Sequence, residues 1–167
     1  MIVCHGSTVA VAEPRILSAY HTLDFGVGFY TTSNEEQALQ WAARVAARRK
    51  VTPTVNIYEF DSIAAGRALT EIRFDNPDEP WLDFTCANRS GRYSHKPYDI
   101  VYGPVADDDV YGTILLYEQG FLDKEAAIKR FKVKQLYNQI LFHSPRSLIY
   151  LQYISHIITG GAHDGTK

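Results

Sequence analysis

Cysteine is scarce in this sequence, which has only Cys4 and Cys86 in 167 residues. Two thiols cannot form a disulfide framework, and no two cysteines have the Cys-x-x-Cys spacing of a zinc ligand set. The N-terminus lacks a basic segment followed by an apolar one, and no run of about 18 apolar residues occurs. These absences predict a cytoplasmic protein with reduced thiols, no bound metal and no membrane span.

The chain also has little net charge. Its formal charge is −2 and its isoelectric point is near 6.3. A weakly acidic chain lacks the basic surface typical of proteins that bind nucleic acid without sequence preference. We therefore favour a protein over a nucleic acid as the macromolecular partner. A nucleic acid would need a local basic patch, such as Arg44, Arg48, Arg49 and Lys50.

Length and composition favour a single domain. With 46% hydrophobic residues the chain can form one sizeable core, and domains commonly have about 100–150 residues. The end of the chain, residues 159–167, is interpreted as a disordered tail. One domain is therefore expected over residues 1–158.

Hydrophobic periodicity predicts strands and helices in an irregular order. Strands are expected at residues 2–4, 28–32, 54–60, 98–105, 138–143 and 148–154. Helices are expected from about 34 to 49, from about 81 to 88, from the aspartates at 107–109 towards 117, and over 123–133. Ser33 with Glu36 has the spacing of a capping box at the start of the first helix. Since strands and helices do not alternate regularly, the α+β class is favoured.

Two segments suggest a site for NAD+. The first is His5-Gly6-Ser7, at the end of the first expected strand, and the second is Phe25-Gly26-Val27-Gly28-Phe29-Tyr30. The second is not a Rossmann fingerprint, because Thr31 stands where the third glycine would be. Cleavage of the nicotinamide–ribose bond requires a bent dinucleotide, held by a glycine main chain, a histidine and an aromatic ring. His5, Gly6 and Tyr30 can supply these groups.

With the later segment Asn138-Gln139-Ile140-Leu141-Phe142, these motifs resemble ADP-ribosyltransferases of the diphtheria-toxin and poly(ADP-ribose) polymerase type. Through Tyr98–Asp107 and Arg89 the chain is similar to small bacterial domains of this kind, often encoded beside toxin–antitoxin genes. The resemblance implies a split antiparallel β-sheet with flanking helices and NAD+ between its halves. It implies catalytic roles for His5, Tyr30 and Gln139, and NAD+ contacts from His5, Gly6, Ser7, Gly28, Tyr30 and Arg89.

The third residue of the resembled signature is usually Glu, but here it is Gln139. A carboxylate stabilises the oxocarbenium-like transition state and accepts a hydrogen bond from the ribose 2′-hydroxyl. A Gln amide can accept that bond but cannot act as a general base. Transfer of one ADP-ribose to a protein or nucleic acid is therefore expected, as by a toxin-like effector with a cognate antitoxin. The alternatives are a catalytically inactive NAD+ or ADP-ribose binding module and a partner-binding protein.

Other residues have roles that the sequence leaves open. His143, Glu118 and the aspartates at 107–109 are alternative candidates for a general base. Arg89 can bind a pyrophosphate or belong to the end of a helix. Trp41 lies near the position of a second stacking aromatic in the polymerases, but we interpret it as a core residue of its helix.

Overall fold

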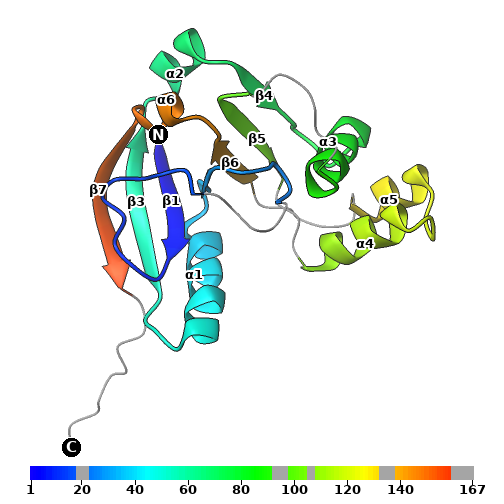
Figure 1. Cartoon of the computed structure of the whole chain (residues 1–167), viewed down its shortest axis with the longest axis horizontal. Helices are drawn as coiled ribbons and strands as arrows, with labels where there is room; N and C mark the ends of the chain where they lie inside the picture. The colour runs from blue at the N-terminus through cyan, green and yellow to red at the C-terminus, as the bar shows by residue number, and fades with distance from the viewer. Residues whose placement is uncertain (18–22, 92–97, 105–107, 132–137, 159–167) are drawn as a thin grey trace, which may run out of the picture.

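The computed structural model describes residues 1–17, 23–91, 98–104, 108–131 and 138–158 (Figure 1). The strands within these ranges are β1 (Ile2–Ser7), β2 (Phe29–Thr31), β3 (Thr54–Phe60), β4 (Glu71–Arg73), β5 (Ile100–Pro104), β6 (Asn138–Phe142) and β7 (Leu151–Ile158). The helices are α1 (Glu35–Arg49), α2 (Ser62–Ala68), α3 (Glu79–Arg89), α4 (Asp108–Glu118), α5 (Lys124–Phe131) and α6 (Pro145–Leu148). The expected tail, residues 159–167, lies outside the described residues.

Three strands form an antiparallel sheet in the order β1-β3-β7, with α1 packed against one side (Figure 1). Alternate residues of a strand face opposite sides of its sheet. Cys4 and Val55 face α1, whose buried Ala38 and Ala42 present small side chains to them. The other side of the sheet is also apolar, and its buried residues include Val3, Tyr58, Phe60 and Leu151.

The other four strands form a mixed sheet in the order β2-β6-β5-β4. The β2–β6 and β5–β6 pairs are antiparallel, whereas β4 and β5 are parallel and are connected through α3. A parallel pair requires such a crossover connection. One face of this sheet packs against α3, α4 and α5 in a cluster that includes Trp81, Ile114, Phe131 and Leu141. The other face joins the apolar side of the first sheet through Phe29, Ile100, Ile140 and Phe142.

Asp99, immediately before β5, connects three distant segments. Its carboxylate accepts hydrogen bonds from the backbone N–H and Oγ1 of Thr70, at 2.9 and 2.8 Å, and from Ser144 Oγ at 2.6 Å. Arg146 binds the same carboxylate through Nε and Nη2. The Arg146 guanidinium, with the bonds from Ser144 and Thr70, holds the pKa of Asp99 well below its ordinary value despite burial. Asp99 is therefore ionised at neutral pH and fixes α6 against the start of β4 and β5.

The structure confirms the α+β class, and β3 and the end of α1 have the predicted bounds. Four details differ. β1 continues through His5-Gly6-Ser7, because all six of its residues pair with β3. The N-cap of α1 is Asn34, whose side chain accepts from Gln37 N–H, so Ser33 was the wrong residue. The last strand begins and ends later than expected, at Leu151–Ile158, and the elements α2 and β4 were missed.

No helix in the described part of the chain is long and apolar enough to cross a membrane. The longest is α1, with 15 residues, and it ends in Arg48 and Arg49. A membrane-spanning helix needs about 20 predominantly apolar residues.

Candidate functional site

In the described part of the chain, one backbone bridge joins the two sheets, between β1 and residue 32, just beyond β2. Cys4 N–H donates to the Thr32 carbonyl at 2.8 Å, and Thr32 N–H donates to the Cys4 carbonyl at 2.9 Å. In an antiparallel ladder the next such pair lies two residues along each strand, which here is Gly6 with Tyr30. No backbone hydrogen bond joins these two described residues. Instead, Nδ1 of His5 lies 2.7 Å from the Tyr30 carbonyl oxygen and interrupts the ladder.

This interruption leaves the main chain of Gly6 facing the split between the sheets. Both polar backbone groups of Cys4 point towards β2, and alternation directs those of Gly6 to the same edge. A Cβ atom at Gly6 would lie 2.4 Å from the Ala38 carbonyl oxygen and 3.0 Å from the Ala42 nitrogen, so only glycine keeps α1 this close to β1. Gly6 thus presents an N–H donor and a carbonyl acceptor, the two groups that bind a carboxamide.

The imidazole of His5 is neutral and has a defined tautomer. Because a carbonyl oxygen can only accept, Nδ1 carries the hydrogen and donates to Tyr30. Burial lowers the pKa of His5, and the hydrogen bond to the Tyr30 backbone opposes this shift without cancelling it. The ring stacks on Phe29, with centroids 4.3 Å apart. Nε2 of the neutral ring is therefore a hydrogen-bond acceptor, suited to a hydroxyl group.

The side chain of Tyr30 is anchored by its own loop. Its hydroxyl donates to the Gly26 carbonyl at 2.7 Å and accepts from Phe25 N–H at 3.2 Å. Burial raises the pKa of Tyr30, and the backbone hydrogen bond from Phe25 only partly offsets this. The phenol therefore stays protonated and cannot serve as a base. Its ring packs against the apolar cluster that includes Leu141, and a stacking contact with NAD+ stays a prediction.

Gln139 is almost fully buried, with 6% of its surface exposed. It pairs with Gly103 across β5 and β6. Its amide nitrogen Nε2 is buried and has no hydrogen-bond partner among the described residues. Leaving a buried amide unpaired costs about 1–3 kcal/mol, and such groups are rare in folded proteins. An oxygen atom of a bound ligand would remove this penalty.

The predicted site residues lie on two faces of the sheet. Tyr30 pairs with Leu141 on the face covered by α3, α4 and α5, and Gln139, two residues from Leu141, shares that face. His5 stacks on Phe29, which belongs to the opposite face. A single ligand can contact both sets only by passing through the split between β1 and β2. Ser7 stands at the end of β1 on the His5 side.

Gly28 has a packing role that the sequence did not reveal. A Cβ atom there would lie 2.3 Å from Cδ1 of Leu141 and 2.5 Å from the Phe142 carbonyl oxygen. A glycine is thus required for β2 to approach β6, and a contact of Gly28 with NAD+ stays a prediction.

Arg89 belongs to an ion pair at the end of α3. Its Nη1 atom lies 2.9 Å from Oδ1 of Asp24, and both side chains are largely buried. Its guanidinium carbon also lies 4.0 Å from the ring centroid of Tyr111. The structure therefore places Arg89 against the loop that leads to Tyr30, with its charge already balanced, and not at the β1–β2 split. Its contact with NAD+ stays a prediction.

His143 and Trp41 lie in other surroundings than the sequence suggested. His143 does not join Gln139, because it lies beyond the opposite end of β6 and its Nδ1 donates to the Val27 carbonyl. The interpretation of Trp41 as a core residue is wrong, since 51% of its surface is exposed. Its Cδ1 atom lies 3.1 Å from the position that a Cβ on Gly6 would occupy, so its ring lies against Gly6 on the α1 side of β1.

Asn138 is a positioning residue that the sequence analysis missed. Its Oδ1 accepts from the N–H and Oγ of Ser33, at 3.2 and 3.0 Å, and its Nδ2 donates back to that Oγ at 2.8 Å. These bonds fix the residue before Gln139 to the turn before α1. The two partners are 105 residues apart, so no local pattern could have indicated them.

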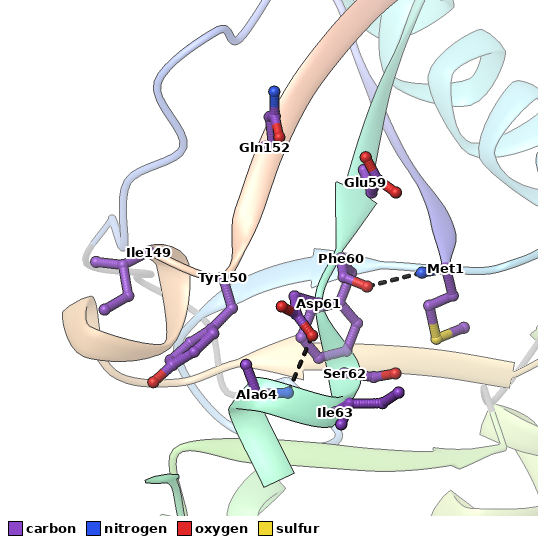
Figure 2. Close-up of a pocket in the computed structure, with 10 residues that line it drawn as sticks. All are labelled: Met1, Glu59, Phe60, Asp61, Ser62, Ile63, Ala64, Ile149, Tyr150 and Gln152. Atoms are coloured by element: carbon purple, nitrogen blue, oxygen red, sulfur yellow. Dashed lines mark hydrogen bonds between the residues drawn. The ribbon is translucent and has the colours of Figure 1, made fainter. Parts of the chain in front are cut away.

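A shallow groove of about 520 Å³ lies elsewhere, at the other end of the first sheet (Figure 2). Its lining comes from the starts of β1 and β7, the end of β3 and the start of α2, and includes Glu59, Asp61, Ile63, Ile149 and Tyr150. Asp61 already caps α2 by accepting from Ala64 N–H at 2.9 Å. None of the predicted site residues lines this groove. Within the described residues no cluster of His, Cys, Asp and Glu side chains could hold a metal ion.

Residues 1–153 match the model of a family described as "Protein of unknown function (DUF3990)", and the chain therefore belongs to this family. No curated protein and no solved structure matches the chain. The family assignment covers all the candidate site residues, but its description attaches no activity to them.

Proposed function

We propose that this member of the DUF3990 family is a mono-ADP-ribosyltransferase, which breaks the nicotinamide–ribose bond of NAD+ and transfers ADP-ribose to a macromolecule. The observation that carries the proposal is the interrupted ladder between β1 and β2, where His5 binds the Tyr30 carbonyl and no backbone hydrogen bond joins Gly6 to Tyr30. The proposal includes the split-sheet fold of ADP-ribosyltransferases. Two observations support this fold: the described sheets are joined by the Cys4–Thr32 bridge, and helix α1 comes directly after β2.

The proposal assigns a role to each of four groups. The main chain of Gly6 binds the carboxamide of NAD+, and the neutral Nε2 of His5 accepts a hydrogen bond from a ribose hydroxyl. The ring of Tyr30 stacks on nicotinamide, and the unpaired amide of Gln139 binds the 2′-hydroxyl. Ser7, at the end of β1, and Gly28, just before β2, are the further NAD+ contacts of this proposal, whereas Arg89 would reach NAD+ only by leaving its ion pair with Asp24.

The chemistry requires no metal and no protein nucleophile. The C1′–N bond breaks, the bonding pair leaves with neutral nicotinamide, and C1′ becomes electron-deficient. A nucleophile of the acceptor then bonds to C1′ and loses its proton to water. Gln139 orients the ribose without accepting a proton, and positioning of the reactants supplies much of the rate. This division of roles favours transfer of one ADP-ribose over chain synthesis.

The proposal extends to the cellular setting. We place the protein in the bacterial cytoplasm as a toxin-like effector, with a cognate antitoxin as a further partner. The formal charge of −2, taken over the whole chain, favours a protein acceptor.

A second candidate function is an inactive NAD+ or ADP-ribose binding module. The observation that favours it is the neutral, buried side chain of Gln139 at the position where charge would stabilise the transition state. Both functions require NAD+ to bind, and only the first releases nicotinamide.

The two functions are separated by NAD+ labelled in its adenylate phosphate. The protein is incubated with it and a bacterial lysate, free nicotinamide is measured by chromatography, and incorporated label is measured after precipitation. His5→Leu should reduce both signals at least about 10-fold, whereas His156→Leu, on the exposed part of β7, should not. NAD+ binding by calorimetry without nicotinamide release would select the binding module. Absence of binding would refute both functions.

A further inference from the structure

The exposed side of α1 carries a concentrated positive charge. Four cationic side chains are exposed in its last two turns and at its C-cap, Arg44, Arg48, Arg49 and Lys50. The chain as a whole carries −2, so the remainder carries −6 once these four are set aside. No acidic residue occurs between Glu36 and Glu59, and no ion pair joins Arg48, Arg49 or Lys50 to a carboxylate of the described residues.

An exposed aromatic ring lies in line with these cations. Trp41, Arg44 and Arg48 are three and four residues apart, so they follow one stripe of the helix. The guanidinium carbon of Arg44 lies 5.8 Å from the centroid of the Trp41 ring, of which half is exposed. Because Trp41 also lies against Gly6 on the α1 side of β1, the stripe begins beside that residue and runs along α1.

We propose that this stripe binds a single-stranded nucleic acid, which is the acceptor of the ADP-ribose; this second clause rests on the proposed function. Cations along a groove or stripe bind the phosphate backbone, and an exposed aromatic ring stacks with an unpaired base. A duplex has no unstacked base to offer Trp41. An acidic protein segment would match the charge but gives no reason for a planar apolar ring among the arginines.

The positive charge on α1 thus favours a nucleic acid as the acceptor, whereas the formal charge of the whole chain favoured a protein. A strand lying on the stripe has one end beside Gly6, where the proposed reaction occurs. An amino or hydroxyl group of a nucleotide there would attack C1′ and release its proton to water as nicotinamide leaves. Electrostatic attraction to α1 would also offset the repulsion from the acidic remainder of the protein.

The binding test needs no NAD+ and so is independent of catalysis. Fluorescence anisotropy with labelled single-stranded DNA and RNA oligonucleotides, and with a duplex of the same sequence, gives affinities across salt concentrations. If four phosphates are neutralised, the logarithm of affinity falls with the logarithm of salt with a slope of about −3. That is about a 50-fold loss between 50 and 200 mM salt.

Variants locate the binding surface. Arg48→Gln with Arg49→Gln should flatten the slope by about 1.4, whereas the matched pair Lys129→Gln with Arg130→Gln, exposed on α5, should leave it unchanged. Trp41→Ala should weaken binding about 5- to 150-fold, as expected for one stacked base, and Trp41→Phe should recover part of it. Circular dichroism checks that each variant is folded.

The results decide between the classes of partner. Single-strand binding that depends on both Trp41 and the two arginines supports the surface, and label removed by nuclease but not by protease identifies the strand as acceptor. Absence of oligonucleotide binding at 50 mM salt, or binding that the α1 variants leave unchanged, would overturn the surface. Label found only in protein would overturn the acceptor assignment. If nicotinamide is never released, the proposed function fails while the anisotropy result stands.

Discussion

Substitution of Gln139 is the sharpest test of the proposed reaction. The proposed function gives its amide the place of the usual catalytic carboxylate. The residue is 6% exposed, and its Nε2 atom has no partner in the described residues. If Gln139 orients the ribose, Gln139→Ala should slow nicotinamide release about 10- to 1000-fold, the effect of removing one positioned polar group near developing charge. Gln139→Glu should retain or increase the rate, because it adds a charge at nearly constant size.

Because Gln139 is buried, the Ala and Glu variants should differ in their free energy of unfolding. Gln139→Ala loses one buried methylene group, worth about 0.8 kcal/mol, but it also removes an unpaired amide that costs about 1–3 kcal/mol. Its free energy of unfolding should therefore stay close to that of the wild type, and lost activity cannot be ascribed to unfolding. Gln139→Glu buries a carboxylate that gains no described donor. Each unit by which burial raises the pKa of that carboxyl costs about 1.4 kcal/mol at neutral pH.

This raised pKa also determines how the stability of the Gln139→Glu variant changes with pH. The pKa of the new carboxyl is higher in the folded protein than in the unfolded chain. The loss of folding free energy is therefore complete above the folded pKa, and it disappears as pH falls below the unfolded pKa. Thermal melts at pH 7.5 and 4.5, with and without NAD+, measure this, and nicotinamide release is measured in parallel. Robust wild-type turnover that neither substitution changes would remove Gln139 from the mechanism and refute the reasoning.

Three other residues give independent tests. Tyr30→Ala should weaken NAD+ binding by about 1–3 kcal/mol in calorimetry if the ring stacks on the ligand, and an unchanged affinity would exclude Tyr30 from the site. Burial lowers the pKa of His5, so its contribution to stability is full above the unfolded pKa of about 6.5 and is lost as pH falls towards the folded pKa; urea titrations at pH 7.5 and 5.5 should show a smaller change in His5→Asn than in the wild type. Asp99→Ala should lower the free energy of unfolding by at least about 2 kcal/mol at pH 7, because Thr70, Ser144 and Arg146 lose a charged acceptor. Because the folded pKa of Asp99 is depressed, its contribution is present above the unfolded pKa of about 3.9 and is lost as pH falls through the folded value. The stability difference between wild type and Asp99→Ala should therefore shrink in melts below pH 4, and a constant difference would contradict the role of ionisation.

Local sequence patterns were enough to predict most of the helices and strands. The alternation from Thr54 to Phe60 and the alanine spacing that ends at Arg49 gave β3 and the end of α1, because backbone periodicity and side-chain size act over a few residues. Elements that depend on remote partners were missed. β4 has only three residues and exists because it pairs with β5.

The sequence by itself determined which chemical groups are available to the proposed site: a histidine, a glycine main chain, a tyrosine ring and an uncharged amide. Only the tertiary structure decided how these groups can act. After the Cys4–Thr32 bridge, the Tyr30 carbonyl binds His5 and forms no backbone hydrogen bond with Gly6. Packing of α1 on β1 left Trp41 exposed, with cations beside it. Such relations depend on which strands and helices meet, and those partners are separated along the chain by too many residues for local periodicity to specify them.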